Sequence, residues 1–579
     1  LRLAELYAQD GQWTEAVQLL ERVVQLGPDR STRKEVHWRL ANLWDEKLGE
    51  SERALTHLQA VLDLDPRHPD ALARLSEVHI RDGRLKEAAA AAARLLNATD
   101  DATTRAAALV QLARIEEERH NHRASIEALR EAIVLEGTAG NAAKTFRRFA
   151  RAASDWESYV DALRLHGKGH ELSEDARAAL HLEAARVLTE TLHKTPAALR
   201  WLEDGLEATG GHTALRLELA FRLRMCGESA RALPHLQSIL QGEPWQVDTW
   251  RQLAVTFDEL GQPDAARIAL EPLLALHAAT QAEQHILTTR PATHAPLPAH
   301  VLTAEVIGRV SGYNEAEGVA AELLALIDTG LGRLFPLDLD AYGLSPRDKI
   351  ATRGGHPLRS LAETLGQALG VFEFDLYVHR VRARGLAIEL GSVPSILLPA
   401  SLSELTYARQ AFVLMRALGP IAQRVHAAEK LTRRELEVLL AAAARLVDPN
   451  FGTGLTGEDE LNAQCKRIYR AVPRKHRKHL EAVATRYVAA GPVDFGRFIR
   501  KIEQGAVRTA ALVADDLHGS IEVLRDLERD RERAALSIPA YVKQAPVVIE
   551  LLRFWCSDAA YWLRHALGRL PPLPQAPAR

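Results

Sequence analysis

The chain of 579 residues is too long for a single hydrophobic core, so its length predicts several domains or a repeat array. Hydrophobic residues make up 47% of the chain and charged residues 26%, as in ordinary globular proteins. Aromatic residues are few, at 5%, while Ala, Leu and Arg are abundant, which favours helix. The formal net charge of −3 gives no reason to expect nucleic acid or an anionic membrane as the main partner.

Three cysteines, Cys226, Cys465 and Cys556, lie far apart and form neither a disulfide framework nor a C-x-x-C metal motif. No apolar run reaches the roughly 18 residues of a membrane span. We therefore expect a cytoplasmic protein without a membrane span. The chain begins at Leu1 inside a helical pattern, which predicts a fragment of a longer protein and leaves open whether a signal precedes it.

Two distant segments share one pattern of apolar, aromatic and small positions. The first copy has Leu3, Ala4, Tyr7, Gly11, Ala16 and Leu20, and the second has Leu253, Ala254, Phe257, Gly261, Ala266 and Leu270. Glycine suits the turn between two helices, because it adopts backbone conformations that cost other residues more. The alanines let the paired helices approach closely, and the larger apolar residues fill the space between neighbouring pairs.

This pattern resembles the tetratricopeptide repeat, including Trp250, which opens the last copy, and Pro28, which closes the first. Further copies pass through Leu75, Gly83 and Ala88, through Ala220, Gly227 and Ala232, and, with one extra residue in the turn, through Ala54, Leu58 and Val61. The stretches 105–137, 141–170 and 176–210 are looser but keep about the same period. We expect about eight helical pairs over residues 1–280, stacked as an α-solenoid with a concave groove.

The resemblance implies that this groove binds a peptide or a helix of a partner protein. The best-known variant holds a C-terminal carboxylate with Lys and Asn at fixed positions of the first helix of each pair. The candidate groove face in this chain has Glu5, Asn42, Glu77 and Val255 at those positions. The carboxylate clamp is therefore not reproduced, and these residues otherwise form a solvated inner face.

The repeat pattern ends near residue 280, and a different kind of domain follows. Residues 281–345, which include the proline-rich stretch "TTRPATHAPLPAH" at 288–300, are expected to be a linker with connecting helices. Residues 346–568 are expected to form a mostly helical α+β domain with a small sheet, and the Pro-rich tail 569–579 to be disordered. The whole chain is thus expected to be mainly α.

The expected strands are 372–379, 385–390 and 394–399. The first alternates, with Phe372 and Phe374 on one face and Tyr377 and His379 on the other, which predicts a half-buried strand. The expected helices are roughly 402–427, 431–447, 458–470, 474–490, 493–531 and 546–568.

The stretch "QAFVLMRALGPIAQR" at 410–424 has the apolar spacing of a buried helix. A strand, a second apolar strand and then this helix resemble, over about residues 340–530, the H-E-x-x-H zinc metallopeptidases of the heat-shock and CAAX-prenyl-protease type. In that family an edge strand lines the substrate cleft, and the helix supplies two histidine ligands and a catalytic glutamate.

The motif positions in this chain hold Arg416, Ala417 and Pro420, and Glu503 lies at the position of the third ligand. Arginine is permanently charged and cannot ligate a metal, alanine cannot accept a proton, and proline offers no ligand atom. We therefore expect no catalytic residues, no metal and no cofactor here. If the resemblance does not reflect descent, 410–421 is simply a core helix.

These observations predict a non-catalytic interaction scaffold whose repeats bind a protein, with a decayed peptidase-like domain as a second contact. The basic run "RKHRKH" at 474–479 is interpreted as a solvated helix start, since no interleaved aromatic residues accompany it, so nucleic acid is not expected as a partner. The alternative is a metal-dependent hydrolase, or another enzyme with an unrecognised site or one completed by a missing N-terminal part.

Overall fold

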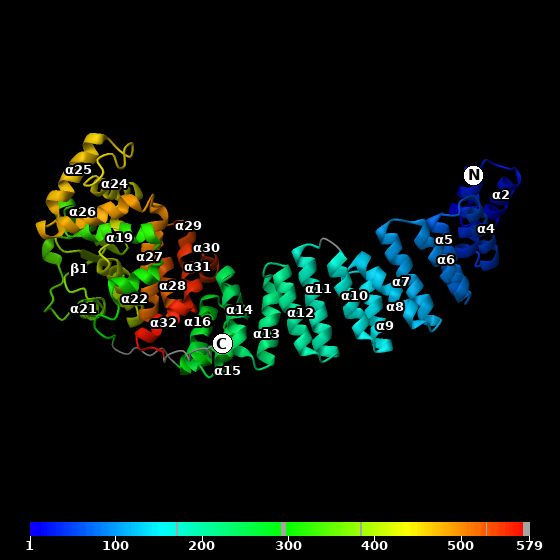
Figure 1. Cartoon of the computed structure of the whole chain (residues 1–579), viewed down its shortest axis with the longest axis horizontal. Helices are drawn as coiled ribbons and strands as arrows, with labels where there is room; N and C mark the ends of the chain where they lie inside the picture. The colour runs from blue at the N-terminus through cyan, green and yellow to red at the C-terminus, as the bar shows by residue number, and fades with distance from the viewer. Residues whose placement is uncertain (170–171, 291–296, 382–384, 529, 571–579) are drawn as a thin grey trace. The chain divides into compact units, whose positions relative to one another are not determined.

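The computed structural model of the chain describes residues 1–169, 172–290, 297–381, 385–528 and 530–570 (Figure 1). The chain divides into two compact units, Leu1–Leu223 and Arg224–Arg579. Helices dominate both units, and a three-stranded sheet lies in the second. The predicted mainly α fold with a small sheet is confirmed.

The first unit is built from antiparallel helical pairs in which the second helix of one pair packs against the first helix of the next (Figure 1). The pairs are α1 (Arg2–Gln9) with α2 (Trp13–Gln25), α3 (Arg30–Asn42) with α4 (Ser51–Leu64), α5 (Pro69–Arg81) with α6 (Leu85–Ala98), α7 (Ala102–Glu118) with α8 (His122–Glu136), α9 (Asn141–Ala153) with α10 (Trp156–Gly169), and α11 (Glu174–Arg186) with α12 (Thr195–Ala208). Two further pairs are α13 (Thr213–Met225) with α14 (Ser229–Gly242), and α15 (Val247–Glu259) with α16 (Pro263–Ala275). The predicted eight pairs are confirmed.

The turns inside these pairs require a left-handed backbone at one position. Gly11 and Gly83 adopt φ values of 75° and 72° there, as their place in the repeat pattern predicts. The looser copies place His120, Ser154 and His193 in the same conformation, with φ between 52° and 59°. These copies look irregular in sequence because a non-glycine residue occupies the turn.

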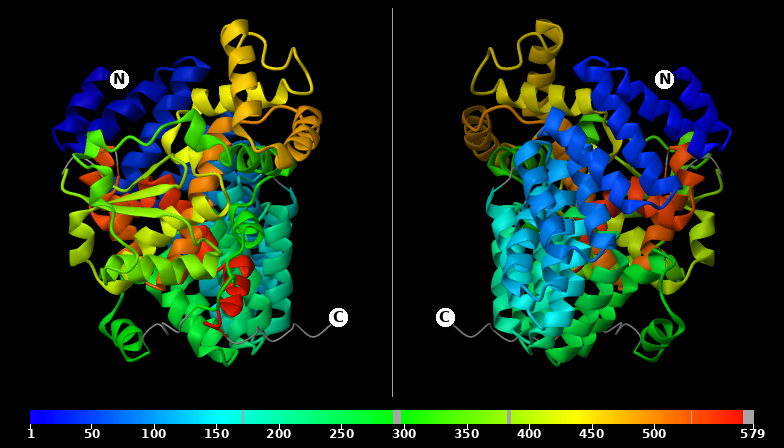
Figure 2. Two further views of the ribbon diagram at one scale, coloured as in Figure 1. Left: turned by 90° about the vertical axis from the view of Figure 1, so that its left-hand side faces the viewer. Right: turned by 90° about the vertical axis from the view of Figure 1, so that its right-hand side faces the viewer.

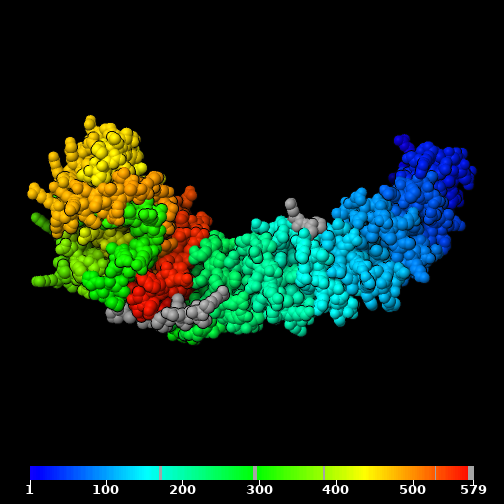
Figure 3. All heavy atoms as spheres, viewed as in Figure 1, coloured from blue at the N-terminus to red at the C-terminus, as the bar shows by residue number. Residues whose placement is uncertain are grey.

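Small residues allow the close helix contacts inside each pair. Ala16 and Ala88 are fully buried, as predicted from the pattern, and so is Ala232 in the second unit. In the space-filling view, the side chains of neighbouring pairs in the first unit meet without open gaps (Figure 3). The apolar stripe of each helix is thereby covered by the adjacent pair.

Two inner helices continue into a short π-helical turn, η1 (Leu43–Lys47) after α3 and η2 (Val187–Thr191) after α11. In each, an amide bonds to the carbonyl five residues earlier, Leu48 to Leu43 and Leu192 to Val187, both at 3.1 Å. A π turn accommodates one extra residue within a helix. The repeat copy through Ala54, Leu58 and Val61 was predicted to have one extra residue in its turn, and η1 accommodates that residue.

Along the chain, the boundary between the two compact units falls within α13 and not near residue 280, where the repeat pattern ends. The last repeat helices belong to the second unit because α16 packs on α28 (Leu517–Asp526) and α30 (Ile538–Gln544), and α14 packs on α31 (Pro546–Trp555). Trp555 Nε1 donates a hydrogen bond to the Ile268 carbonyl at 3.1 Å. The expected boundary therefore marks the end of the repeats, not the edge of a compact unit.

Within the second unit, a buried charge network joins α16 to the segment between α27 and α28. The Arg267 guanidinium donates to Glu271 on its own helix and lies 3.2 Å from Asp515, and all three residues are buried. Arg569 lies 3.8 Å from the same Asp515 carboxylate. Burial raises the pKa of Glu271 to about 8, and the neighbouring Asp515 carboxylate acts in the same direction.

Residues 281–345 contribute more than a linker. They contain α17 (Gln281–Thr289), α18 (Ala304–Ser311), α19 (Glu315–Asp328) and α20 (Leu331–Leu334), while 291–296 lie outside the described residues. Leu323 and Ile327 of α19 are fully buried in the core that also holds Phe498. The α+β domain thus begins before residue 346.

The sheet has the order β1-β3-β2, with β1 (Asp375–His379) parallel and β2 (Ala387–Glu389) antiparallel to the central β3 (Ser395–Pro399). The left panel of Figure 2 faces this sheet. The prediction of a half-buried first strand is wrong, since Tyr377 and His379 are buried and Phe372 is 62% exposed. Leu339 and Tyr342 cover the second face by packing against Tyr377.

The remaining helices of the second unit pack around the sheet and around the hydrophobic core of that unit. They are α21 (Pro357–Leu369), α22 (Tyr407–Ala422), α23 (Ala427–Lys430), α24 (Arg433–Ala444), α25 (Glu458–Ala471), α26 (Arg474–Ala489), α27 (Phe495–Ala514), α29 (Arg531–Ala534) and α32 (Asp558–Ala566). The single helix expected at 493–531 is two helices, α27 and α28, because Asp515 takes a left-handed conformation and Asp516 caps α28. Residues 571–579 of the expected tail lie outside the described residues.

Candidate functional site

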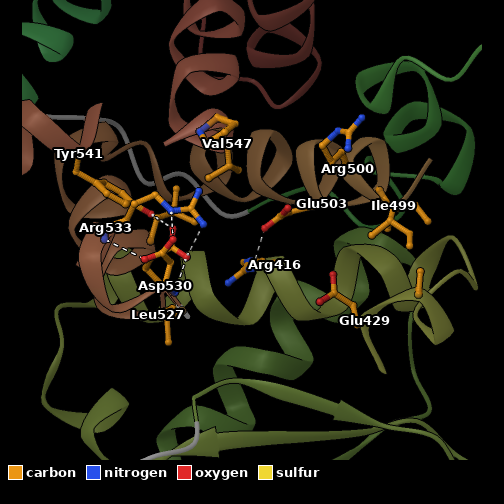
Figure 4. A pocket seen from close by; sticks show the side chains of 15 residues that line it. Arg416, Glu429, Ile499, Arg500, Glu503, Leu527, Asp530, Arg533, Tyr541 and Val547 are labelled. Carbon is orange, nitrogen blue, oxygen red and sulfur yellow. Dashed lines mark hydrogen bonds and ion pairs between the residues drawn. The ribbon is translucent and has the colours of Figure 1, made fainter. Parts of the chain in front are cut away.

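Two helices that pack closely, α22 and α27, form the floor of a cleft in the second unit. A side chain added at Gly419 of α22 would touch the backbone of Ala506 on α27 at 3.7 Å, which shows how near the helices approach. α22 is buried on most of its surface, as predicted for a core helix. Arg416 is an exception, since it points from α22 into the cleft (Figure 4).

Arg416 and Glu503 face each other across the floor of this cleft. The distance from Arg416 Nη2 to Glu503 Oε1 is 3.4 Å, and the two side chains are 18% and 40% exposed (Figure 4). The structure therefore brings together two of the four positions at which the sequence resembles a metallopeptidase site. The predicted roles of these four positions stay predictions.

Above this ion pair lies a cavity of about 690 Å³. Its wall between α28 and α31 is polar: Arg533 lies 3.4 Å from Glu528 and 3.3 Å from Asp530, and the Tyr541 hydroxyl donates to Glu528 at 3.3 Å. Burial raises the pKa of Tyr541, so its hydroxyl remains a donor. The apolar part of the lining comes from Ala428, Ile499, Ile502, Leu524, Leu527, Pro546 and Val547.

A second cavity of about 600 Å³ adjoins the first, because Arg416, Glu429 and Leu527 line both. Its lining includes residues 385–389, which contain β2, together with Ala417. The edge strand beside Arg416 is therefore β2 and not 372–379, since β1 pairs with the other side of β3. Ala417 is fully buried, and Pro420 is buried in α22 and lines neither cavity.

Strand β2 is an edge strand of the sheet, paired only with β3 among the described residues, and it contributes to the lining of the second cavity. The Asp375 amide donates to the Pro394 carbonyl, so the backbone carbonyl of Pro394 points toward β1. The backbone amide and carbonyl groups of successive strand residues point in alternate directions. Those of Ser395 and Leu397 therefore point toward β2, where these residues pair with Glu389 and Ala387. The amide and carbonyl of Ile388 between them consequently point away from β3, in a residue that is buried.

The candidate groove residues of the repeats lie on inner helices, but several are engaged. In the first unit the Arg39 guanidinium donates to Glu5, and Arg74 donates to Glu77 at 3.2 Å. Asn42 carries a buried amide oxygen without a hydrogen-bond partner among the described residues. Val255, in the second unit, is 44% exposed.

Ion pairs between inner helices of successive repeats were not predicted from the sequence. They join residues about one repeat apart: Arg39 with Glu5, Arg81 with Asp45, Arg148 with Glu117, Arg147 with Glu183, Arg222 with Glu190, and, in the second unit, Arg224 with Glu259 and Arg251 with Glu283. A spacing of 31–36 residues between opposite charges would have been the signal. This inner surface is therefore polar and of mixed charge.

A further polar cavity of about 690 Å³ lies beside the start of β3. His426 Nε2 and Asp328 Oδ1 are 3.4 Å apart in its lining, and His426 Nδ1 is buried with no hydrogen-bond partner in the described part of the chain. Burial raises the pKa of Asp328 to about 7 and lowers the pKa of His426 to about 4.

The described residues contain no group of three or more His, Cys, Asp or Glu side chains placed to hold a metal ion. Across the described ranges, no helix combines the length and apolarity needed for a membrane crossing. The three cysteines are free thiols in the structure.

Residues 1–29 and 47–115 match family models of the tetratricopeptide repeat. The helical pairs within these two ranges have the pattern of tetratricopeptide repeats. No curated protein matches the chain. Solved structures that are similar to it include the MamA protein, with 13% identity and a TM-score of 0.18 over 46% of this chain and 100% of that chain. The P58(IPK) TPR domain has 16% identity and a TM-score of 0.20 over 50% and 95% of the two chains. For pilF of Pseudomonas aeruginosa, the identity is 18% and the TM-score 0.18 over 45% and 99%. The tetratricopeptide repeats predicted from the sequence are confirmed.

Proposed function

We propose that the protein is a non-catalytic scaffold with two binding surfaces for proteins. The inner face of its tetratricopeptide repeats binds a peptide or a helix of a partner, because stacked repeats expose an extended surface of inner helices. The cleft of the second unit holds an extended segment without cutting it. With free thiols and no expected nucleic-acid partner, we place this scaffold in the cytoplasm.

The cleft carries the second part of the proposal. Its floor has the Arg416–Glu503 ion pair and Ala417 where the resembled peptidases have ligands and a base, so the floor supplies neither. The outer edge of β2, where the backbone of Ile388 points away from β3, is the edge to which we propose that a strand adds. Shape without the reactive groups favours a decayed peptidase over the alternative of a hydrolase.

A charge reversal on the inner face of the repeats tests the first surface. Glu77→Arg changes an exposed residue of the inner helix α5, and Glu87→Arg makes the same change at an exposed residue of the outer helix α6. Using the tagged full chain, we expect Glu77→Arg to lower recovery of the main captured partner at least tenfold. Glu87→Arg should leave recovery unchanged. Equal recovery with both variants would place the binding surface elsewhere.

A further inference from the structure

Basic residues are concentrated where α25 ends and α26 begins. Residues 466–478 include seven Lys or Arg residues and no Asp or Glu. Six of the seven are exposed and have no ion-pair partner among the described residues: Lys466, Arg467, Arg470, Arg474, Lys475 and Lys478. Both helices pack on α24, so this basic segment is part of the folded second unit (Figure 1). The basic helix start predicted at 474–479 thus belongs to a larger basic surface.

A hollow of about 340 Å³ lies beside these basic residues. Its lining consists of Leu446, Cys465, Lys466, Tyr469, Arg470 and Glu481. Leu446, Cys465 and the Tyr469 ring supply apolar surface, and the basic residues of α25 in the lining are four residues apart on one helix face. Pockets for whole small ligands measure about 300–1,000 Å³, so a hollow at the lower end of this range suits one side chain of a larger partner.

The charges around the hollow differ from the charge within it. Arg474 and Lys478 share a face of α26 with Glu481, because residues three, four and seven apart lie on one side of a helix. Basic groups therefore border the hollow on both helices. A carboxylate of a ligand would be attracted to Lys466 and Arg470 at the rim and repelled by Glu481 further in. The arrangement fits an apolar side chain in the hollow with acidic residues around it.

A nucleic acid fits this surface less well than an acidic protein segment. The Arg477 guanidinium lies 4.4 Å from the centre of the Tyr469 ring and covers one of its faces, so that face is closed to stacking with a base. Glu481 would repel a phosphate that entered the hollow. Basic residues without a free aromatic platform favour a protein partner.

We propose that the ends of α25 and α26 bind an acidic segment of a partner protein, with one large apolar side chain of that segment in the hollow and its Asp and Glu residues against the surrounding Lys and Arg. This surface shares no residue with the cavities around Arg416 or with the inner face of the repeats. The inference therefore goes beyond the proposed function and adds a third binding surface.

The test uses the full chain and fluorescent nonapeptides, measured by fluorescence polarisation. The first peptide has a central Leu between two runs of Asp and Glu. We expect a counterpart with Asn and Gln in place of the acids to bind at least tenfold more weakly, and a counterpart with Ser in place of Leu at least threefold more weakly. The affinity of the first peptide should fall between 50 and 300 mM NaCl.

Three outcomes of this comparison would overturn the inference. Equal binding of the acidic and amide peptides would remove the charge recognition, and equal binding of the Leu and Ser peptides would remove the role of the hollow. Absence of binding by all peptides would reject the surface as a peptide site and leave the cleft and the repeats unaffected. A single-stranded DNA and a DNA duplex serve as competitors, and tighter binding of either than of the acidic peptide would assign the surface to nucleic acid.

Protein variants locate the site. Lys466→Glu with Arg470→Glu reverses the two basic charges of the lining, and we expect at least tenfold weaker binding of the acidic peptide. Lys86→Glu with Arg94→Glu makes the same change in net charge at exposed residues of α6, and it should change the affinity less than twofold. Equal losses in the two variants would show a general electrostatic attraction and would overturn the assignment to α25 and α26.

Discussion

The Arg416 guanidinium lies 3.4 Å from the Glu503 carboxylate, on the closely packed helices α22 and α27. If the peptidase resemblance predicted from the sequence holds, the equivalent carboxylate in those enzymes would bind a metal cation. Here the cation is part of the chain, so Glu503 keeps a positive partner without a metal. The ion pair is partly exposed and contributes only about 0–1 kcal/mol to stability.

Restoring the motif tests whether the resemblance reflects descent. We expect the triple variant Arg416→His, Ala417→Glu and Pro420→His to bind zinc with a 1:1 stoichiometry, measured by mass spectrometry under native conditions. Adding Glu503→Ala should weaken that binding, because it removes the third ligand. A folded triple variant that binds no zinc would remove the main support for the resemblance.

Cleavage of the proline-rich stretch tests how the last repeats are held. The sequence predicts protease sensitivity around 288–300 and two stable fragments after a cut. The packing of α16 on α28 and α30 adds that these fragments should stay associated. We expect the two fragments to co-elute on gel filtration after a cut. Arg267→Ala should promote their separation, since it leaves Glu271 buried without its ion-pair partner and Asp515 with Arg569 alone. Separation of the wild-type fragments under native conditions would contradict this expectation.

The buried alanine of α14 tests the helix packing. Ala232→Leu adds volume where no space exists, and we expect it to lower the free energy of unfolding by roughly 1–3 kcal/mol. Ala230→Leu, two residues earlier on the exposed side of the same helix, is the matched control and should be nearly neutral. Urea unfolding followed by circular dichroism measures both. Similar values for the two variants would mean that the register of the pair is wrong.

The Asp328–His426 pair predicts a specific pH dependence. The pKa of Asp328 is raised to about 7, so the unfolded chain loses this proton at lower pH than the folded one, and stability falls as the pH rises from about 4 to 7. We expect Asp328→Asn to raise the free energy of unfolding at pH 8 by roughly 1–3 kcal/mol and to change it little near pH 4.

The pKa of His426 is lowered to about 4, so its contribution has the opposite sign and is lost as the pH falls from about 6.5 to 4. In Asp328→Asn the stability should therefore rise with pH across this window, because the opposing carboxyl is gone. Urea unfolding at pH 4.5, 6 and 8 measures the effect, with the exposed Asp338→Asn as the control. A gain that is the same at every pH would contradict the assignment.

The repeats could be predicted because their pattern records local geometry directly. Gly11 and Gly83 mark turns that need a left-handed backbone, and Ala16 and Ala88 mark close helix contacts. Where His120 takes the place of glycine, the same turn forms but the pattern weakens. A helical pair can therefore form even where its sequence departs from the regular repeat pattern.

The second unit was harder to predict, because its decisive features come from distant contacts. Alternation at 372–379 indicated a strand, but not that Tyr342 would cover its second face. Likewise, the apolar spacing of the sequence was enough to predict that α22 is a buried core helix. Its apposition to β2 across a cavity depends on the strand order, which puts β3 in the middle and which no local pattern contains.

The π turns η1 and η2 have a consequence for how such an array changes length. One residue inserted into an α-helix rotates everything after it by about 100°, which would move an inner-face residue to the buried side. Because the widened turn absorbs the insertion at the end of α3 and α11, the residues on either side keep their azimuth. A copy that is one residue too long therefore stays in phase with its neighbours, and the inner surface continues across it unbroken.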